Sequence, residues 1–303
     1  MIALGGNALQ QKGVKSFEGM LKNTRGALIR LFSLIRDNNV VLTHGNGPSV
    51  GFLLLQQEAF KGRGMVMPLD VLDAETEGQI GYMIQQQLQN LFRKQGLKRS
   101  IVTLLTQVLV DRRDKAFREP TKFIGPFYSE SEARVLRRKF DVRKDSDRGW
   151  RRVVPSPHPI SIVEASVIKK LMRSGCVVIA AGGGGIPVVK RGTNLEGVEA
   201  VVDKDLASAC LAESLKADIF VMITDVDRVY LNYGADDEKG LSSVKLAELK
   251  KNFSDGHFPA GSMGPKISAA ISFLEKGGKK VFITDIKSID SALRGNAGTV
   301  FVK

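Results

Sequence analysis

The segment CVVIAAGGGGIP, residues 176–187, indicates how this chain folds. Six apolar or small residues predict a short buried strand, and four consecutive glycines predict a sharp turn directly after it. An apolar run without polar alternation is typical of a parallel strand that is covered on both faces. The segment therefore predicts an α/β sheet in which strands end in glycine-rich turns.

The rest of the chain repeats this pattern. Four further apolar runs predict strands, at Val40–Thr43, Ile101–Leu105, Ile219–Thr224 and Val281–Thr284. Helical spacing separates them, as in Leu21, Leu28, Leu31 and Ile35, in Ile80, Ile84, Leu88 and Leu91, and in Ile168, Leu171 and Met172 before Gly175. Strands that alternate with helices favour a mostly parallel sheet covered on both faces.

One segment interrupts the alternation between Asp111 and Pro155. It is punctuated by Pro and Gly, and residues 112–152 carry 14 Lys and Arg against 7 Asp and Glu, a net of +7 out of +13 for the chain. We interpret residues 112–154 as an inserted subdomain on two short stalks, and we expect the proline-rich run at 155–159 to lead into a helix. A solvated surface and a basic lid over a phosphorylated ligand both account for the charge.

Composition excludes several classes of protein. The longest apolar runs are strand-sized, so neither a membrane span nor a signal peptide is expected. The only cysteines are Cys176 and Cys210, which argues against a disulfide framework and favours a cytoplasmic protein. Sparse aromatic interleaving and the lack of a known motif argue against nucleic acid as a partner. His44, His158 and His257 are scattered, so no protein-bound metal site is predicted.

Three glycine-rich turns carry the functional prediction. Gly5–Asn7 follow the first apolar run, His44–Pro48 follow the second, and Gly182–Gly185 follow the run from Cys176. In an open α/β sheet, such turns converge on the ligand crevice at the carboxyl ends of the strands. Glycine lets backbone N–H groups approach an anion closely. Each turn alone could be merely tight, but three together favour a phosphate site.

Two lysines stand near predicted helix N-termini. Lys204 follows a predicted cap, Asp203, and precedes Asp205, which could hold its ammonium group in place; Lys266 follows Pro265. A lysine in a first helical turn is most often a surface residue. No Walker A loop or Gly-x-Gly-x-x-Gly turn accompanies them. Glycine turns with separately delivered lysines favour phosphoryl transfer, which requires mainly positioning and charge neutralisation.

Two carboxylates at the end of a predicted strand leave their role open. Asp225 and Asp227 end the run from Ile219, where a carboxylate can meet ribose hydroxyls or simply cap a turn.

A set of motifs in a fixed order gives the chain a resemblance to a known family. The set comprises Ile2–Leu9, Thr43–Pro48, Gly149–Pro157, Gly182–Val188, Val198–Asp205 and Gly256–Lys266. In this order, over nearly the whole chain, it resembles the carbamate kinases of the amino-acid kinase family. The resemblance implies one domain with a three-layer αβα sandwich fold, a homodimer, and phosphoryl transfer between ATP and carbamate with Mg²⁺. In catabolism, that family commonly runs the reaction from carbamoyl phosphate and ADP toward ATP.

The resemblance also implies roles for individual residues. An N-terminal lobe, about residues 1–175, would bind carbamate or carbamoyl phosphate at Gly5, Gly6, Asn7, Gly45, Asn46 and Gly47. A C-terminal lobe, about 176–303, would bind ATP or ADP at Gly182, Gly183, Gly184, Asp225, Tyr230, Tyr233, Ala260, Met263, Pro265 and Lys266. The implied catalytic residues are Lys204, Lys266, Lys122 of the inserted subdomain, Asp205 and Asn7.

Several positions depart from the pattern of that family. Ser49 stands where glutamine is usual, Phe123 replaces a proline, and His158 replaces a non-aromatic residue. Glu75 and Glu77 flank Thr76, where uncharged residues are normal, and carboxylates there would oppose an anionic substrate unless they point away or pair with the basic subdomain.

These departures leave the fold and phosphoryl transfer untouched, but they keep the identity of the acceptor open. Two alternatives to carbamate kinase remain. One is a family member that phosphorylates another small carboxylate or phosphate. The other is an inactive regulatory or nucleic-acid-binding relative. No lysine precedes Gly5, where relatives acting on those other substrates usually place one, which argues against the first alternative.

Overall fold

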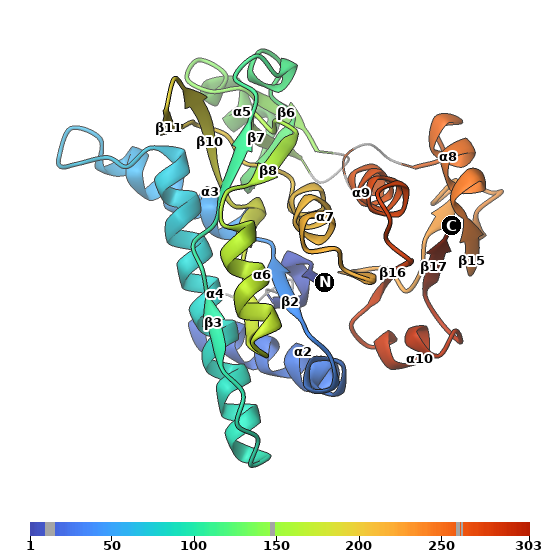
Figure 1. The fold of residues 1–303 in the computed structure, drawn as a ribbon. Coiled ribbons are helices and arrows are strands. Elements are labelled where there is room, and N and C mark those ends of the chain that lie inside the picture. Colours follow the sequence, from blue (N-terminus) through green and yellow to red (C-terminus); the bar gives the residue numbers. More distant parts are fainter. Residues whose placement is uncertain (10–15, 146–148, 259–260, 262) are drawn as a thin grey trace.

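The computed structural model describes residues 1–9, 16–145, 149–258, 261 and 263–303. Eight strands form the central sheet in the order β15-β17-β16-β12-β1-β2-β9-β3 (Figure 1). Their bounds are β1 (Ile2–Leu4), β2 (Val41–His44), β3 (Ile101–Thr103), β9 (Val177–Ile179), β12 (Ile219–Thr224), β15 (Ser243–Lys245), β16 (Lys280–Asp285) and β17 (Thr299–Val302). Neighbouring strands are parallel except β16 and β17. The predicted mostly parallel sheet is thereby confirmed.

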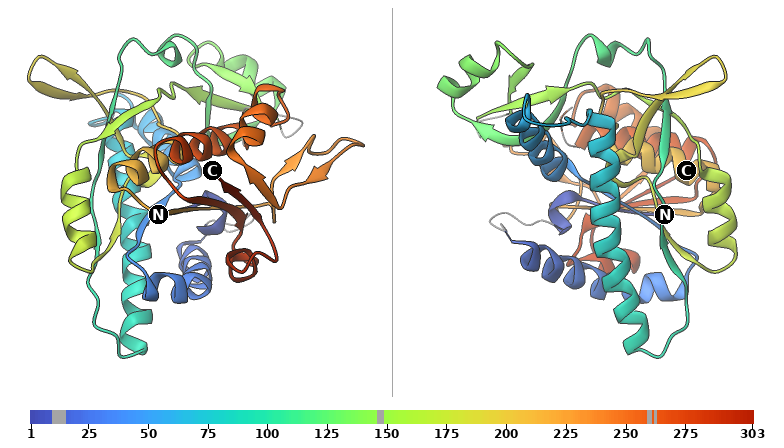
Figure 2. Two further views of the ribbon diagram at one scale, coloured as in Figure 1. Left: turned by 45° about the vertical axis from the view of Figure 1, so that its right-hand side comes forward. Right: turned by 90° about the vertical axis from the view of Figure 1, so that its left-hand side faces the viewer.

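Helices cover both faces of this sheet, and side-chain alternation decides which residues face which layer. On β1, Ile2 and Leu4 pack toward α2 (Phe17–Asp37), α4 (Leu69–Lys94) and α10 (Ile289–Leu293), whereas Ala3 packs toward the opposite layer. That opposite layer contains α6 (Ala165–Arg173), α7 (Lys204–Leu215), α8 (Leu246–Ser254) and α9 (Met263–Glu275). Figure 2 shows α2 and α9 on opposite sides of the sheet. The result is the expected αβα sandwich.

A smaller sheet lies beside the sandwich, in the order β11-β10-β4-β8. Its strands are β4 (Gln107–Val110), β8 (Pro159–Ile162), β10 (Ile186–Arg191) and β11 (Asn194–Gly197). The run at 155–159 was predicted to lead into a helix, and this prediction is wrong, because β8 comes before α6. Pro159 is the first residue of a strand at the edge of its sheet, where its missing N–H costs no ladder bond.

The inserted segment folds as a unit that we call the lid. It contains β5 (Lys122–Tyr128), α5 (Glu130–Leu136), β6 (Val142–Lys144) and β7 (Trp150–Val154), with the 3₁₀ turn η1 (Lys115–Phe117) before it. The three strands form an antiparallel sheet, β5-β7-β6. This sheet packs on α3 (Gly47–Phe60), where Arg152 of β7 forms an ion pair with Glu58. The lid is therefore anchored to the sandwich through α3.

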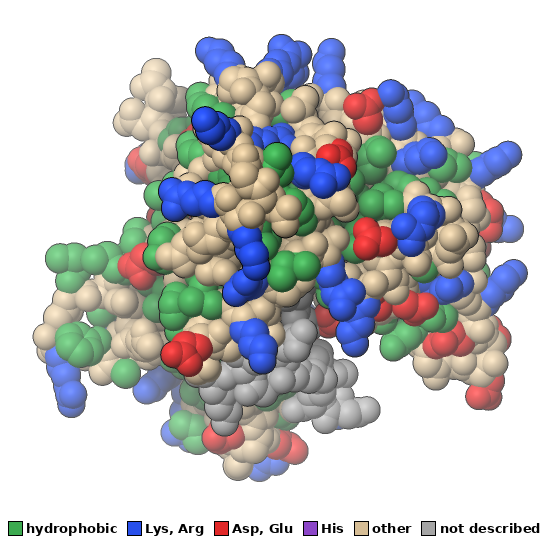
Figure 3. Space-filling view, turned by 90° about the horizontal axis from the view of Figure 1, so that it is seen from below, with side chains coloured by type: hydrophobic (Ala, Val, Ile, Leu, Met, Phe, Trp, Pro, Cys, Tyr) green, Lys and Arg blue, Asp and Glu red, His purple; other side chains and the backbone are tan. Residues whose placement is uncertain are grey.

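The remaining elements are short. They are α1 (Gly6–Leu9), the 3₁₀ turn η3 (Gly182–Gly184) and the hairpin of β13 (Tyr230–Leu231) and β14 (Lys239–Gly240). Cys176 and Cys210 are half-buried and form no disulfide. Within the described residues, every helix is too short or too polar to cross a bilayer. Lys and Arg are scattered among Asp and Glu over the face shown in Figure 3.

Candidate active site

A cleft of about 270 Å³ opens at the carboxyl ends of β1, β2 and β12. The lid contributes one wall, from β5, and the first turns of α7 and α9 contribute another. The lining residues are Gly5, Gly6, Gly45, Asn46, Gly47, Lys122, Ile124, Gly183, Val201, Asp203, Lys204, Asp205, Thr224, Asp225, Gly261 and Lys266. The structure thus brings residues from all three predicted glycine turns together with both predicted lysines.

Close backbone contacts fix the first two turns against the sheet and each other. The N–H of Gly5 donates to the carbonyl of Ile223 at 3.0 Å, and the N–H of Gly45 donates to the carbonyl of Leu4 at 3.1 Å. A Cβ at Gly5 would lie 2.8 Å from the Ile223 oxygen. Glycine is therefore required at residue 5 by the approach of β12. The backbone of Asn7 lies in α1, but its side chain is outside the described residues.

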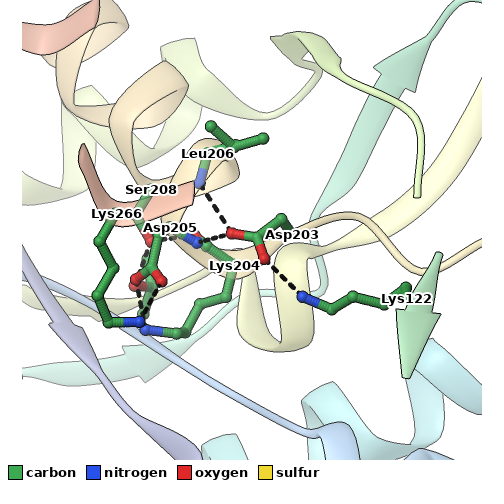
Figure 4. A network of polar contacts seen from close by, with 8 residues as sticks. Lys122, Asp203, Lys204, Asp205, Leu206, Ser208 and Lys266 are labelled. Carbon is green, nitrogen blue, oxygen red and sulfur yellow. Dashed lines mark hydrogen bonds and ion pairs between the residues drawn. The ribbon is translucent and has the colours of Figure 1, made fainter. Parts of the chain in front are cut away.

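Two lysines meet on one carboxylate at the centre of the cleft (Figure 4). Lys204 Nζ donates to Asp205 Oδ1 and Lys266 Nζ donates to Asp205 Oδ2, each at 2.7 Å. The side chain of Lys204 is 12% exposed, that of Lys266 is 14% exposed and that of Asp205 is 5% exposed. Asp205 therefore holds two ammonium groups side by side at the floor of the cleft.

The start of α7 explains why these groups lie there. Asp203 is the N-cap residue, and its Oδ1 accepts the backbone N–H groups of Asp205 and Leu206. Its other oxygen, Oδ2, lies 2.5 Å from the Nζ of Lys122 on β5. Lys204 is thus the first residue of the helix, as predicted, and its cap also binds the lid lysine. Figure 4 shows Lys122 approaching Asp203 from the lid.

Burial and pairing together set the charges of this cluster. Burial alone would raise the pKa of Asp205, but Lys204 and Lys266 outweigh it and hold the pKa of this carboxyl well below its usual value. Asp203 behaves in the same way, since Lys122 overcomes the effect of burial and lowers its pKa. Burial lowers the pKa of Lys204, although Asp205 opposes the shift. For Lys266, the attraction of Asp205 exceeds the effect of burial and raises the pKa.

The four-glycine run forms a turn that no other residue type could form. Gly183, Gly184 and Gly185 have φ angles of 71°, 106° and 79°. A Cβ at Gly183 would lie 2.2 Å from Asn46 Nδ2, and one at Gly184 would lie 2.1 Å from the carbonyl oxygen of Val202. Of the run, Gly183 lines the cleft. Gly182 and Gly184 are buried beside it, and their N–H groups donate to Glu77 and to the carbonyl of Ala181.

A buried polar cluster on α4 lies behind these turns, and sequence reasoning missed its role. Asn46 Nδ2 donates to Asp73 Oδ1 at 3.1 Å and to Thr76 Oγ1 at 2.9 Å. Glu77, which is 1% exposed, accepts the backbone N–H groups of Gly182 and Thr106. Helical spacing places Asp73, Thr76 and Glu77 on one face of α4, and this was the signal available in the sequence. Their partners, 27 to 105 residues away, could not be read from it.

The glutamates that depart from the family pattern differ in position. Glu75 is exposed, whereas Glu77 is buried and directed at backbone amides rather than paired with the basic lid. Ser49, Phe123 and His158 are not among the residues that line the cleft. The guanidinium of Arg151 lies over the ring of Phe123, with its Cζ 5.8 Å from the ring centroid. His158 is exposed, and its backbone N–H donates to Asp114.

A second pocket of about 170 Å³ continues from the cleft. It is lined by Thr224, Asp225, Val226, Tyr230, Tyr233, Met263 and Lys266, of which Thr224, Asp225 and Lys266 also line the cleft. The hydroxyl of Tyr230 donates to Asp227 Oδ1 at 2.8 Å, and the rings of Tyr230 and Tyr233 lie 5.8 Å apart. A largely apolar pocket with aromatic walls suits a planar base.

Three residues of the predicted nucleotide set, Gly182, Gly184 and Pro265, line neither pocket. Pro265 is the third residue of α9. Ala260 lies outside the described residues.

The chain is similar to known proteins over nearly its whole length. Residues 1–285 match the amino acid kinase family. The chain is 50% identical over 305 residues to the carbamate kinase of Pyrococcus furiosus, an alignment that covers 99% of this chain and 97% of that protein.

Two solved structures of the carbamate kinase of Giardia lamblia are similar over 100% of this chain and 97% of theirs. The form bound to citric acid has a TM-score of 0.94 and 43% sequence identity. The form bound to AMP-PNP has a TM-score of 0.90 and 44% sequence identity.

Proposed function

The chain belongs to the amino acid kinase family, and from this membership we propose that it is a carbamate kinase, which transfers a phosphoryl group reversibly between ATP and carbamate. Full-length identity of 42–50% to carbamate kinases supports this function. The observation that carries the proposal is the pair of ammonium groups on Asp205, at the point where the glycine turns meet.

The chemistry suits this arrangement. An oxygen of carbamate attacks the γ-phosphorus of ATP, the bond from phosphorus to the bridging oxygen breaks, and that oxygen leaves with ADP. Carbamate is already an anion, so no general base is needed. Charge on the equatorial phosphoryl oxygens is what the site has to stabilise. Lys204 and Lys266 supply that stabilisation, and Asp205 orients both lysines before the reaction begins.

The two ends of the cleft suit the two substrates. Gly5, Gly6, Asn7 and the segment Gly45–Gly47 are proposed to bind the carbamate or carbamoyl group, and Lys122 is proposed to reach the transferred phosphoryl group from the lid. The second pocket, with Tyr230 and Tyr233, is proposed to receive the nucleotide base. Pocket apolarity supports this assignment, because it offers a stacking surface next to the charged cleft.

The proposal includes Mg²⁺ with the nucleotide. Within the described residues, no group of three or more His, Cys, Asp or Glu side chains is arranged to hold a metal ion. Asp203 and Asp205 in the cleft are already paired with lysines. This fits an ion that is held chiefly by phosphate oxygens, as Mg²⁺ commonly is. When bound, Mg²⁺ would supply further neutralisation of phosphate charge.

The finer parts of the proposal rest on the resemblance in sequence. They are a homodimer, a cytoplasmic location, and operation toward ATP from carbamoyl phosphate and ADP in the catabolism of arginine. Size-exclusion chromatography with light scattering measures the first of these directly.

A coupled assay in both directions tests the function. The purified protein is given ADP with carbamoyl phosphate, and separately ATP with ammonium bicarbonate, each with and without Mg²⁺. We expect turnover in both directions and its loss on chelation. No turnover with carbamoyl phosphate, together with turnover on another carboxylate or phosphate in a substrate panel, would reject the proposal.

A further inference from the structure

We propose that Glu77 is a positioning residue of the phosphoryl-transfer site, whose ionised carboxylate fixes the Gly182–Gly185 turn and thereby places Gly183 in the cleft. The inference rests on the proposed function for its kinetic part only. The resemblance described in the sequence analysis marks Glu77 as a departure from the expected pattern, and the mechanism above does not use this residue.

The contacts of Glu77 show how it acts. From α4, its Oε1 accepts the N–H of Gly182 at 2.9 Å and its Oε2 accepts the N–H of Thr106 at 3.0 Å. The hydroxyl of Thr106 accepts the N–H of Ala181 at 2.9 Å. One carboxylate therefore joins the start of the glycine turn to the segment between β3 and β4.

The contacts also specify the charge state that performs this role. Both oxygens of Glu77 face N–H donors, so the ionised form can accept both bonds. An amide presents its NH₂ group to one of these donors and loses that bond. A protonated carboxyl is a weaker acceptor than the carboxylate at both oxygens, because the bonds are no longer charge-assisted. An unpaired backbone N–H at this depth is costly, because no water replaces the lost acceptor. Neutral Glu77 would therefore hold the turn less firmly than ionised Glu77.

The surroundings place this change of charge within an accessible pH range. Burial raises the pKa of Glu77 to about 8, although the amides of Thr106 and Gly182 oppose the shift. Its charged surroundings include Glu164 before α6, which acts on Glu77 directly, and Asp73 on the same helix, on which Glu77 and Asp70 both act. His44 on β2 lies beside them, and Lys204 on α7 acts on His44. Burial lowers the pKa of His44 to about 4, so this imidazole stays neutral across the range in which Glu77 titrates.

Two substitutions on one turn of α4 separate positioning from general effects of charge. Glu77→Gln keeps the size of the side chain and imitates the protonated form. Glu75→Gln removes the same formal charge two residues away, at an exposed position, and serves as the matched control. Thermal unfolding shows whether each variant is folded. The kinetic readout is kcat/KM for carbamoyl phosphate and ADP from pH 6 to pH 10.

The test compares kcat/KM of the wild type with kcat/KM of each variant, as a ratio at each pH. At pH 6 Glu77 is itself neutral in the wild type, so we expect the kcat/KM values of the wild type and Glu77→Gln to be nearly equal. The ratio should rise through pH 8 to about tenfold, the scale of one charge-assisted hydrogen bond. Glu75→Gln should follow the wild type throughout. A wild-type to Glu77→Gln ratio that stays constant with pH would mean that the charge of Glu77 plays no part in positioning. A ratio that falls as pH rises would mean that the ionised carboxylate mainly repels the anionic substrate. Either result overturns the proposal.

Hydrogen exchange gives a readout that does not depend on activity. At pH 9, the peptide that contains residues 180–186 should exchange faster in Glu77→Gln than in the wild type or in Glu75→Gln. Equal exchange in all three proteins would overturn the proposal even in an active enzyme. Faster exchange in a protein that is inactive on carbamoyl phosphate would leave the positioning role standing and reject the proposed function instead.

Discussion

The backbone of Gly51 on α3 lies directly against the backbone of Gly125 on β5. A Cβ at Gly51 would come within 2.0 Å of the nitrogen and 2.2 Å of the Cα of Gly125. The contact therefore has no room for any side chain, and it sets how closely the lid approaches the sandwich. Lys122, three residues before Gly125 on the same strand, reaches the cleft from this position.

We predict that Gly51→Ala displaces the lid and impairs turnover. The new methyl group must push β5 outward, which moves Lys122 away from Asp203 and from the transferring phosphoryl group. Displacement on the scale of 1 Å lowers kcat/KM by roughly 10- to 100-fold. Steady-state kinetics measure the loss. Gly26→Ala on α2 is the control, because a Cβ there meets nothing within 4 Å, and its activity should be unchanged. Normal kinetics in Gly51→Ala would show that the enzyme tolerates a larger separation between β5 of the lid and α3.

Removing either cleft lysine should impair chemistry far more than folding. Lys204→Ala and Lys266→Ala each delete one of the two ammonium groups on Asp205, and we expect kcat to fall by roughly 10²- to 10³-fold. Circular dichroism and thermal unfolding verify the fold. Lys276→Ala removes an exposed ion pair with Glu213 and should have near-normal activity. Near-normal rates in both cleft variants would contradict the roles assigned to Lys204 and Lys266.

Acid should destabilise the protein through His44. Its pKa is lowered to about 4 in the folded state by burial, against about 6.5 in an unfolded chain. As pH falls below 6.5, the unfolded chain binds a proton that the native protein does not, so stability drops until about pH 4. The loss amounts to about 3 kcal/mol.

Urea denaturation of His44→Gln between pH 7 and pH 4 tests this prediction. The variant should lose stability less steeply than the wild type across this window, because glutamine does not titrate. Other titrating groups are present in both proteins and cancel in the difference. Parallel curves for the two proteins would mean that the native imidazole takes up its proton at an ordinary pH.

The nucleotide pocket offers a milder prediction. Tyr230→Phe removes the hydrogen bond to Asp227 that orients the ring, while the aromatic wall remains. We expect KM for ADP to rise by about 3- to 10-fold with kcat little changed, because this bond orients the ring and does not itself contact the base. Tyr82→Phe, at an exposed position on α4, is the matched control. An unchanged KM in Tyr230→Phe would place the base elsewhere.

Much of the central sheet could be predicted because its strands are short, apolar and buried. The run Ile219–Thr224 is β12 residue for residue, and Val281–Thr284 falls within β16. The lid sheet was not predicted as strands. The strand β5 carries Gly125 and Pro126 at its centre, where the register shifts, and this composition is typical of loops. Its pairing partner β7 lies across a segment that contains α5 and β6, so no local pattern revealed it.

The site divides in the same way. Helix capping by Asp203 and the first-turn position of Lys204 follow from local chemistry, and both could be predicted. The shared use of Asp205 by Lys266 depends on how α7 and α9 pack, 61 residues apart, and only three-dimensional structure shows it. The bond that Glu77 accepts from Gly182 of the four-glycine turn crosses a still longer stretch of chain. From the sequence, Glu77 was visible only as an unexpected charge.

The two oxygens of Asp203 have separate tasks: Oδ1 caps α7 and Oδ2 binds Lys122. Departure of Lys122 would therefore leave both capping bonds intact, and the first turn of α7 would keep its shape. Substrates could then enter and products leave in each turnover while Lys204 and Asp205, at the start of α7, keep their positions.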